Sequence, residues 1–176
     1  QGMISCQITR VFLPSGLGQY LLGLALWQGR VDFDAAADRY FEAAFGPDGA
    51  ACRDYLETLS RLCLPPYSRK ERPAVDPEAA ASFAKLPGVV EAFLPTIRKH
   101  AEGLKDRAQA LSWQYLLFHA GLVQRVAAFL LARATGDKAG MDAAWTDCVA
   151  YVRAIEPEVQ PVHEAYEFIR TFGRLL

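Results

Sequence analysis

Few residues in this sequence combine the type and the spacing that chemistry needs. The three histidines, His100, His119 and His163, lie far apart along the chain. His119 falls within the most apolar stretch, residues 111–134, which favours a core histidine with satisfied hydrogen bonds over a metal ligand. The sequence contains no glycine-rich phosphate loop, no His-Glu-x-x-His motif and no Gly-x-Ser-x-Gly motif. We therefore predict no catalytic residue and no cofactor in this chain.

The acidic residues and the cysteines fit structural roles. Asp32 and Asp34 are spaced like a pair of catalytic carboxylates, but both precede a helical pattern and are typical helix caps. The chain has four cysteines, none in a Cys-x-x-Cys pair: Cys6, Cys52, Cys63 and Cys148. Thiolate metal sites need closely spaced pairs of ligands, so we predict no metal site and expect buried thiols.

The composition favours helices and gives no electrostatic reason to bind a polyanion. The chain has 28 Ala and 21 Leu against 11 Val and 5 Ile, and strong helix formers therefore dominate over residues that prefer strands. The 19 Lys and Arg nearly balance the 20 Asp and Glu. We predict no nucleic-acid partner and no membrane partner, since the polar residues inside 111–134 favour a buried helix over a membrane span.

The periodicity of apolar residues predicts a mostly all-α fold, a bundle of about seven or eight helices with one short N-terminal strand. The strand is expected at residues 4–13, and residues 64–77, with four prolines and a basic cluster, are expected to form a solvated loop. A break is expected at 86–88, and another at 156–161. The helices are expected at 17–27, 35–45, 50–63, 76–84, 89–104, 106–134, 138–155 and 162–172.

The N-terminal third of the chain resembles a known family. The residues that carry the resemblance are the run from Gly2 to Leu17 (GMISCQITRVFLPSGL), Gln19-Tyr20, Leu26-Trp27, Tyr40–Gly46 (YFEAAFG) and Tyr55-Leu56. Together they are similar to the C-terminal part of a domain-of-unknown-function family of α-glucuronidase-like glycoside hydrolases. The resemblance implies that residues 1–30 are the last strand and helix of a catalytic barrel. Residues 31–176 would then form an α-helical C-terminal domain.

The same resemblance implies that most of the catalytic machinery lies outside this chain. The acid and nucleophile carboxylates of such an enzyme come from upstream barrel strands, so we expect an accessory domain without activity of its own. Gln7 and Arg10, near the end of the expected strand, would reach sugar hydroxyls or a uronate carboxylate. A plain salt bridge or capping contact is the alternative role for Arg10.

Two partners follow from this interpretation. The first is the upstream barrel, which would cover the apolar faces of residues 1–30. The second is another copy of the chain, paired as a homodimer through the N-terminal segment, because an uncovered apolar face and strand edge favour association. Alternatively, the segment folds back onto the bundle and the chain stays monomeric.

A second function class is an autonomous helical interaction module unrelated to sugars. Leu22-Gly23, Ala35 and Pro47 have the spacing of a tetratricopeptide repeat. Arg39 and Glu42 occupy positions that should be small or apolar, and no second copy of the pattern follows, whereas a solenoid needs at least three repeats.

Overall fold

The structure, a computed structural model, describes Arg10 and residues 12–103 and 106–174. In that part of the chain the backbone forms α-helices, one 3₁₀-helix and no β-strand, which confirms the predicted all-α fold. Among these residues, seven α-helices have nine or more residues. The elements are α1 (Leu17–Gln28), α2 (Phe33–Phe45), η1 (Gly46–Asp48), α3 (Gly49–Leu62), α4 (Pro65–Ser68), α5 (Pro77–Phe83), α6 (Leu86–Gly103), α7 (Arg107–Thr135), α8 (Lys138–Val159) and α9 (Ala165–Gly173).

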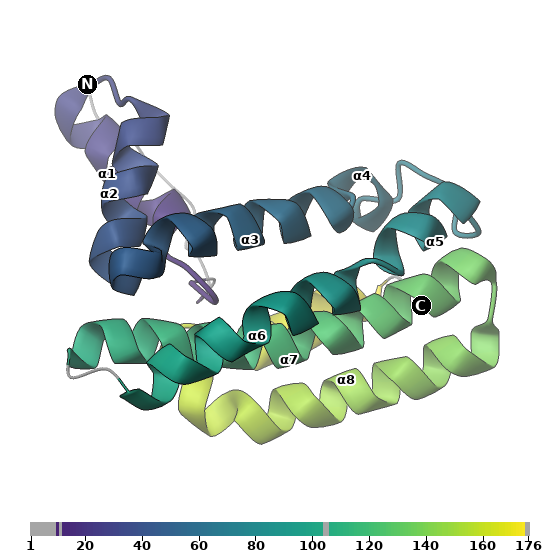
Figure 1. Cartoon of the computed structure of the whole chain (residues 1–176). Helices are drawn as coiled ribbons and strands as arrows, with labels where there is room; N and C mark the ends of the chain where they lie inside the picture. The colour runs from purple at the N-terminus through teal and green to yellow at the C-terminus, as the bar shows by residue number, and fades with distance from the viewer. Residues whose placement is uncertain (1–9, 11, 104–105, 175–176) are drawn as a thin grey trace.

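The long helix α7 is the centre of the fold. It lies between α6 and α8 and also packs against α5 and α2 (Figure 1). Asp106 caps its start by accepting hydrogen bonds from the backbone N–H groups of Ala108 and Gln109. Gly136, in the left-handed conformation, ends it. The buried residues of α7 are Trp113, Leu116, Ala120, Leu122, Val123, Ala127, Phe129, Leu130 and Ala134.

Within the described residues, α7 is also the one helix that could span a membrane as judged by length and composition. A core helix of a globular fold meets the same two criteria, because it too must be apolar over most of its surface. In this chain the neighbours of α7 are α6 and α8, which pack along it.

The helices α1 and α2 stand at one end of the bundle (Figure 1). The main neighbour of α1 is α2, and the rings of Tyr20 and Tyr40 lie 5.6 Å apart between them. The Tyr40 hydroxyl also accepts a hydrogen bond of 2.7 Å from the Gly16 backbone N–H. None of the residues of α1 is buried. This helix is therefore attached along one side only.

The two N-terminal aspartates have different roles. Asp32 caps α2, because its Oδ1 accepts a hydrogen bond of 3.1 Å from the Ala35 backbone N–H. Asp34 instead forms an ion pair of 2.6 Å with Arg53 of α3. Arg53 also pairs with Asp38 and Glu57, so its guanidinium joins α2 to α3. Both carboxylates are thus engaged in structure.

Two predicted helix breaks are wrong. We expected residues 86–88 to interrupt the chain, but α6 begins at Leu86, and Pro87 lies in the first turn. A first-turn N–H has no acceptor within the helix, so proline costs little there. We also expected a break at 156–161, but α8 continues through Pro157 to Val159. Burial of Ile155 and Val159 offsets the one hydrogen bond that Pro157 removes near the helix end.

The proline-rich segment 64–77 is anchored rather than fully solvated. It contains the short helix α4, whose Tyr67 is completely buried. The Tyr67 hydroxyl donates a hydrogen bond of 2.6 Å to the Ala74 carbonyl, and its ring meets Phe83 of α5 edge to face at 5.1 Å. Both arginines of the basic cluster are paired, Arg69 with Glu71, and Arg72 with Asp76 and Glu78 at the start of α5.

The predicted N-terminal strand is not seen. Residues 1–9 and 11 lie outside the described residues, and Arg10, Phe12 and Leu13 are irregular. A strand requires a neighbouring strand to satisfy its backbone groups. Among the described residues of this segment, pairing is limited to two backbone hydrogen bonds, from Phe12 to Val162 and from Glu164 to Arg10.

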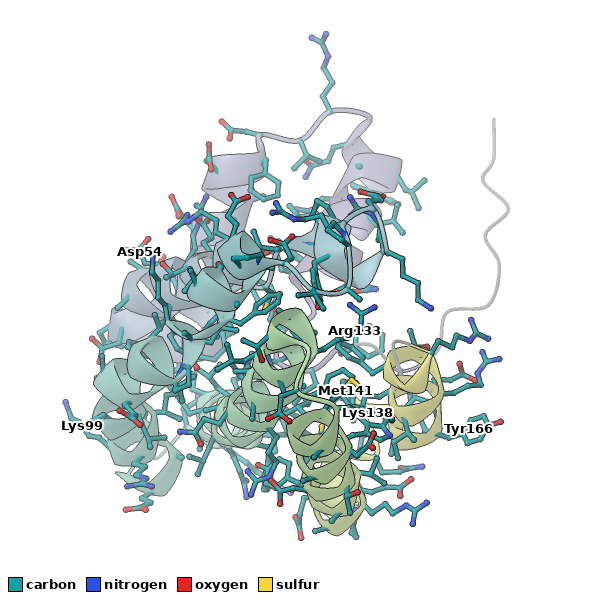
Figure 2. The ribbon with its side chains drawn as sticks, turned by 90° about the vertical axis from the view of Figure 1, so that its right-hand side faces the viewer. Asp54, Lys99, Arg133, Lys138, Met141 and Tyr166 are labelled. Atoms are coloured by element: carbon teal, nitrogen blue, oxygen red, sulfur yellow. The ribbon has the colours of Figure 1, made fainter. Side chains whose placement is uncertain are left out.

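Side chains of mixed type mark the turn between α7 and α8 and the outer side of α9. Arg133, Lys138 and Met141 gather at the turn between α7 and α8, and Tyr166 points outward from α9 (Figure 2). Lys138 pairs with Asp142, and the Arg133 guanidinium lies over the Tyr67 ring, 5.0 Å from its centroid. These cations contribute to packing at the turn.

Candidate functional site

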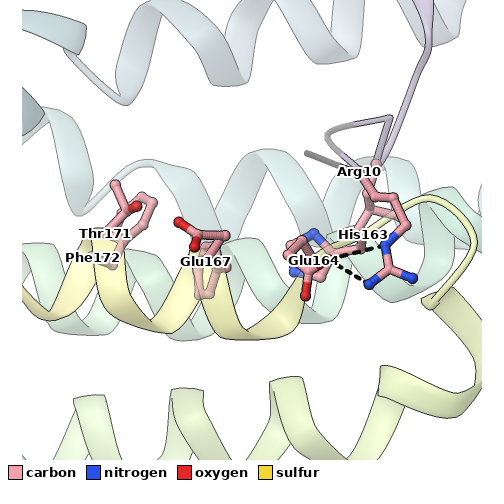
Figure 3. Close-up of a pocket in the computed structure, with 8 residues that line it drawn as sticks. Arg10, His163, Glu164, Glu167, Thr171 and Phe172 are labelled. Atoms are coloured by element: carbon pink, nitrogen blue, oxygen red, sulfur yellow. Dashed lines mark hydrogen bonds and ion pairs between the residues drawn. The ribbon is translucent and has the colours of Figure 1, made fainter. Parts of the chain in front are cut away.

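The candidate site lies where the chain enters the bundle, beside the start of α9 (Figure 3). Arg10 donates from Nε to Glu164 Oε2 at 3.1 Å, and its Nη2 forms an ion pair with the same oxygen. Glu164 is the N-cap residue of α9, yet its side chain makes no capping hydrogen bond. The carboxylate therefore serves Arg10 rather than its own helix.

Two backbone hydrogen bonds hold the same segment. The Phe12 N–H donates to the Val162 carbonyl at 2.9 Å, and the Glu164 N–H donates to the Arg10 carbonyl at 3.0 Å. This reciprocal pattern is that of a single antiparallel β-type pair. Leu13 continues the contact by packing against a small apolar cluster that includes Leu122 and Ala165. The segment is thus attached by backbone, charge and apolar contacts together.

A cavity of about 290 Å³ lies beside these contacts. Arg10, His163 and Glu164 line one part of it, and Glu167, Phe168 and Thr171 continue along α9. Figure 3 shows Glu167, Thr171 and Phe172 following one another along the helix. Glu167 is itself paired with Arg170 at 2.6 Å. The charged groups of the cavity are therefore engaged with protein partners.

Two histidines lie beneath the segment. His163 is 9% exposed, and its Nε2 is buried with no hydrogen-bond partner among the described residues. His119 of α7 has a buried Nδ1 that likewise finds no partner in the part of the chain that the structure describes. Burial, with a smaller contribution from His163, lowers the pKa of His119 to about 4. The expectation of a satisfied core histidine is therefore wrong at this nitrogen.

The pKa of His163 is also lowered, by burial. Glu164 and Glu156 act in the opposite direction, since their negative charges favour the imidazolium form. Burial outweighs both carboxylates. Both imidazoles are consequently neutral at pH 7 in the folded chain, and each keeps one buried ring nitrogen without a partner.

Of the two predicted substrate-binding residues, one can be placed. Gln7 lies outside the described residues. Arg10 lines the cavity and is paired with Glu164, so a ligand carboxylate would have to compete with that glutamate. Contact of Arg10 with a sugar remains a prediction from the resemblance.

The residues that complete this site escaped the sequence analysis. Glu164 stands at the start of the last helix, and 154 positions separate it from Arg10. No local pattern joins residues so far apart. The only local signal is the acidic residue itself, because an N-cap side chain normally accepts a hydrogen bond from the first turn of its helix. The Glu164 side chain makes no such hydrogen bond.

No cluster suited to a metal ion was found among the described residues. Cys52 and Cys148 are buried free thiols, and Cys63 is half-buried. Burial raises the pKa of the Cys63 thiol, which disfavours the reactive thiolate.

Comparisons with family models, curated proteins and solved structures found no match to this chain. The proposals that follow therefore rest on the residues themselves and on the N-terminal pattern.

Proposed function

We propose that this chain is a helical accessory domain without catalytic activity of its own. Its role is to dock, through α1, against the catalytic part of a carbohydrate-active enzyme of the glycoside-hydrolase type. The observation that supports this is the state of α1, an apolar helix that the rest of the described chain leaves uncovered.

The composition of α1 is typical of a buried helix, but its side chains are exposed. The helix LGQYLLGLALWQ has no charged residue, and a helix that is apolar on every side is normally buried. Here Trp27 is 89% exposed and Leu26 is 59% exposed, and Phe33 at the start of α2 is 55% exposed. Contiguous apolar surface of this kind is uncommon on an isolated domain and usually marks an interface. We infer that the free side of α1 contacts another protein surface.

The attachment of α1 to α2 supports a docking role. The contact between Tyr20 and Tyr40 and the hydrogen bond from Gly16 hold one side of the helix. The opposite side is therefore presented in a defined orientation, which lowers the entropy cost of binding.

The nature of the partner is proposed from the resemblance. In the family that residues 2–56 resemble, the strand and the helix of this segment close the catalytic barrel. The outer helices of such a barrel pack on its strands through apolar faces, and the uncharged face of α1 would pack in the same way. Where no such partner is present, we expect the same face to pair two copies of this chain.

The shielding of Trp27 tests the proposal. Trp113 is buried and Trp145 is half-buried, so acrylamide quenching of tryptophan fluorescence in the isolated chain reports mainly on Trp27. A polypeptide that joins this domain to the proposed catalytic barrel should show much weaker quenching. The Trp27→Phe variant of each protein supplies the background from the other two tryptophans.

Two results would reject this function. One is Trp27 quenching that is equal in the isolated chain and in the polypeptide that includes the barrel. The other is a coding region without barrel-like alternation of strands and helices upstream of, or next to, this chain. The second result would favour the autonomous interaction module.

A further inference from the structure

The segment before α1 covers both unpartnered histidines. Arg10 and Leu13 line the cavity that contains His163. Pro14 and Ser15 line a second cavity, also of about 290 Å³, that contains His119. Residues of one short stretch of chain thus line the cavities beside both imidazoles.

We propose that Arg10 and residues 12–15 form a pH-sensitive latch, in which His119 and His163 are the groups whose protonation opens it. The latch is closed by the Arg10–Glu164 ion pair, the two backbone hydrogen bonds and the packing of Leu13. Opening detaches the chain that leads into α1. The inference is independent of the proposed docking function.

The charges around the histidines determine the direction of the response. His163 faces Glu156 of α8, Glu164 beside α9 and His119 of α7. Arg10 of the latch and Glu167 of α9 line the same cavity. His119 shares its own cavity with Cys63, at the end of α3, whose thiol stays protonated because burial raises its pKa.

Both histidines favour the closed latch only when they are neutral. A protonated imidazole has two N–H donors, and one nitrogen of each ring is buried without a partner. A cationic His163 would also repel a cationic His119 and lie in the same cavity as Arg10. Opening the segment relieves both costs, because it admits water to the rings and moves Arg10 away.

The expected size follows from proton linkage. The pKa of His119 is lowered from 6.5 to about 4 in the closed form, so closing excludes a proton from this group. The closed form is favoured above the ordinary histidine pKa, and this advantage is lost as the pH falls below it. For each histidine the ratio of open to closed latch should rise about tenfold per pH unit between the two pKa values. For His119 the limit is about 300-fold, approached below pH 4.

Amide hydrogen exchange of the full chain tests the latch. The Phe12 and Glu164 amides donate the two latch hydrogen bonds, and the Val152 amide in the middle of α8 reports on the core. Between pH 7 and pH 5, the protection factors of the two latch amides should fall at least tenfold, while that of Val152 changes less than threefold. In the variant His119→Gln/His163→Gln, the latch protection should be independent of pH.

A matched variant separates the trigger from the closure. Glu164→Gln weakens the ion pair, so it should lower the latch protection at every pH and retain the dependence on pH. A side-chain NMR titration of the unmodified chain gives the pKa values of His119 and His163 directly, even where a variant fails to fold. The midpoint of latch opening should follow these two titrations.

Three results would overturn the proposal. The first is an unchanged pH dependence in the double histidine variant. The second is loss of protection at the latch only together with Val152, which is global unfolding. The third is titration of both histidines near pH 6.5 with the latch still protected.

Discussion

The helices α1 and α7 make opposite use of similar residues. Both are rich in leucine, and α1 has no charged residue, whereas α7 contains three arginines and a histidine. Yet α7 has nine buried residues and α1 has none. The difference lies in their neighbours, since α6 and α8 pack along α7 and only α2 packs substantially on α1. An apolar helix requires burial, but its own sequence does not specify what buries it.

The largest difference between α1 and α7 should appear in the free energy of unfolding when one tryptophan in each helix is replaced. Trp113 of α7 is fully buried, stacks on His100 at 4.6 Å and donates from Nε1 to the Phe45 carbonyl at 3.2 Å. Trp113→Ala should lower the free energy of unfolding by about 3–5 kcal/mol in a urea titration. Trp27→Ala should change it by less than ~0.5 kcal/mol, because this side chain is mostly in water. Equal losses would show that α1 is buried in the isolated chain.

A charge on the exposed face of α1 should weaken association. If the isolated chain forms a dimer at micromolar concentration, Leu26→Glu should raise its dissociation constant by at least ~10-fold in sedimentation equilibrium, because a buried unpaired carboxylate opposes the interface. Tyr166→Glu is the matched control, since Tyr166 is 68% exposed on α9, outside this face. An unmodified chain that sediments as a clean monomer would contradict the homodimer.

Glycine to alanine substitutions should change the free energy of unfolding in opposite directions in the two helices. A Cβ at Gly121 of α7 would lie 2.3 Å from the Tyr151 hydroxyl, which donates a hydrogen bond to the Phe118 carbonyl. Gly121→Ala should therefore destabilise the fold by about 1–3 kcal/mol. Gly23 of α1 has no neighbour within 4 Å, so Gly23→Ala should stabilise by about 0.5–1 kcal/mol through helix propensity. Thermal unfolding followed by circular dichroism measures both, and equal signs would break the contrast.

The smallest expected effect concerns catalysis, where we expect no signal from either region. The purified chain should not hydrolyse aryl glycosides or aryl glucuronides, because the paired carboxylates of such enzymes come from barrel strands. The measurement is release of the aryl group at millimolar substrate. Turnover that survives repurification and disappears with a single substitution in this chain would show that the accessory role is wrong.

Local signals predicted most of the helices. Asp32, Asp76 and Asp106 accept hydrogen bonds from the first turns that they cap, and Gly29 and Gly136 end their helices in the left-handed conformation. Each of these effects operates within about four residues, so a sequence pattern can reveal it. The errors at Pro87 and Pro157 also have a local cause. The cost of a proline depends on its position within the helix. The predicted helices began after Pro87 and ended before Pro157, so neither proline was assigned to a helical turn.

The sequence by itself determined the helical class, the main caps and the apolar character of α1. Only the tertiary structure decided that Arg10 meets Glu164, and that His119 and His163 lie beneath one short segment. Contacts of this kind join residues from opposite ends of the chain, and they depend on how α7, α8 and α9 pack. Composition and periodicity act over a few residues, whereas the burial and charge that shift a pKa are summed over every neighbour in space.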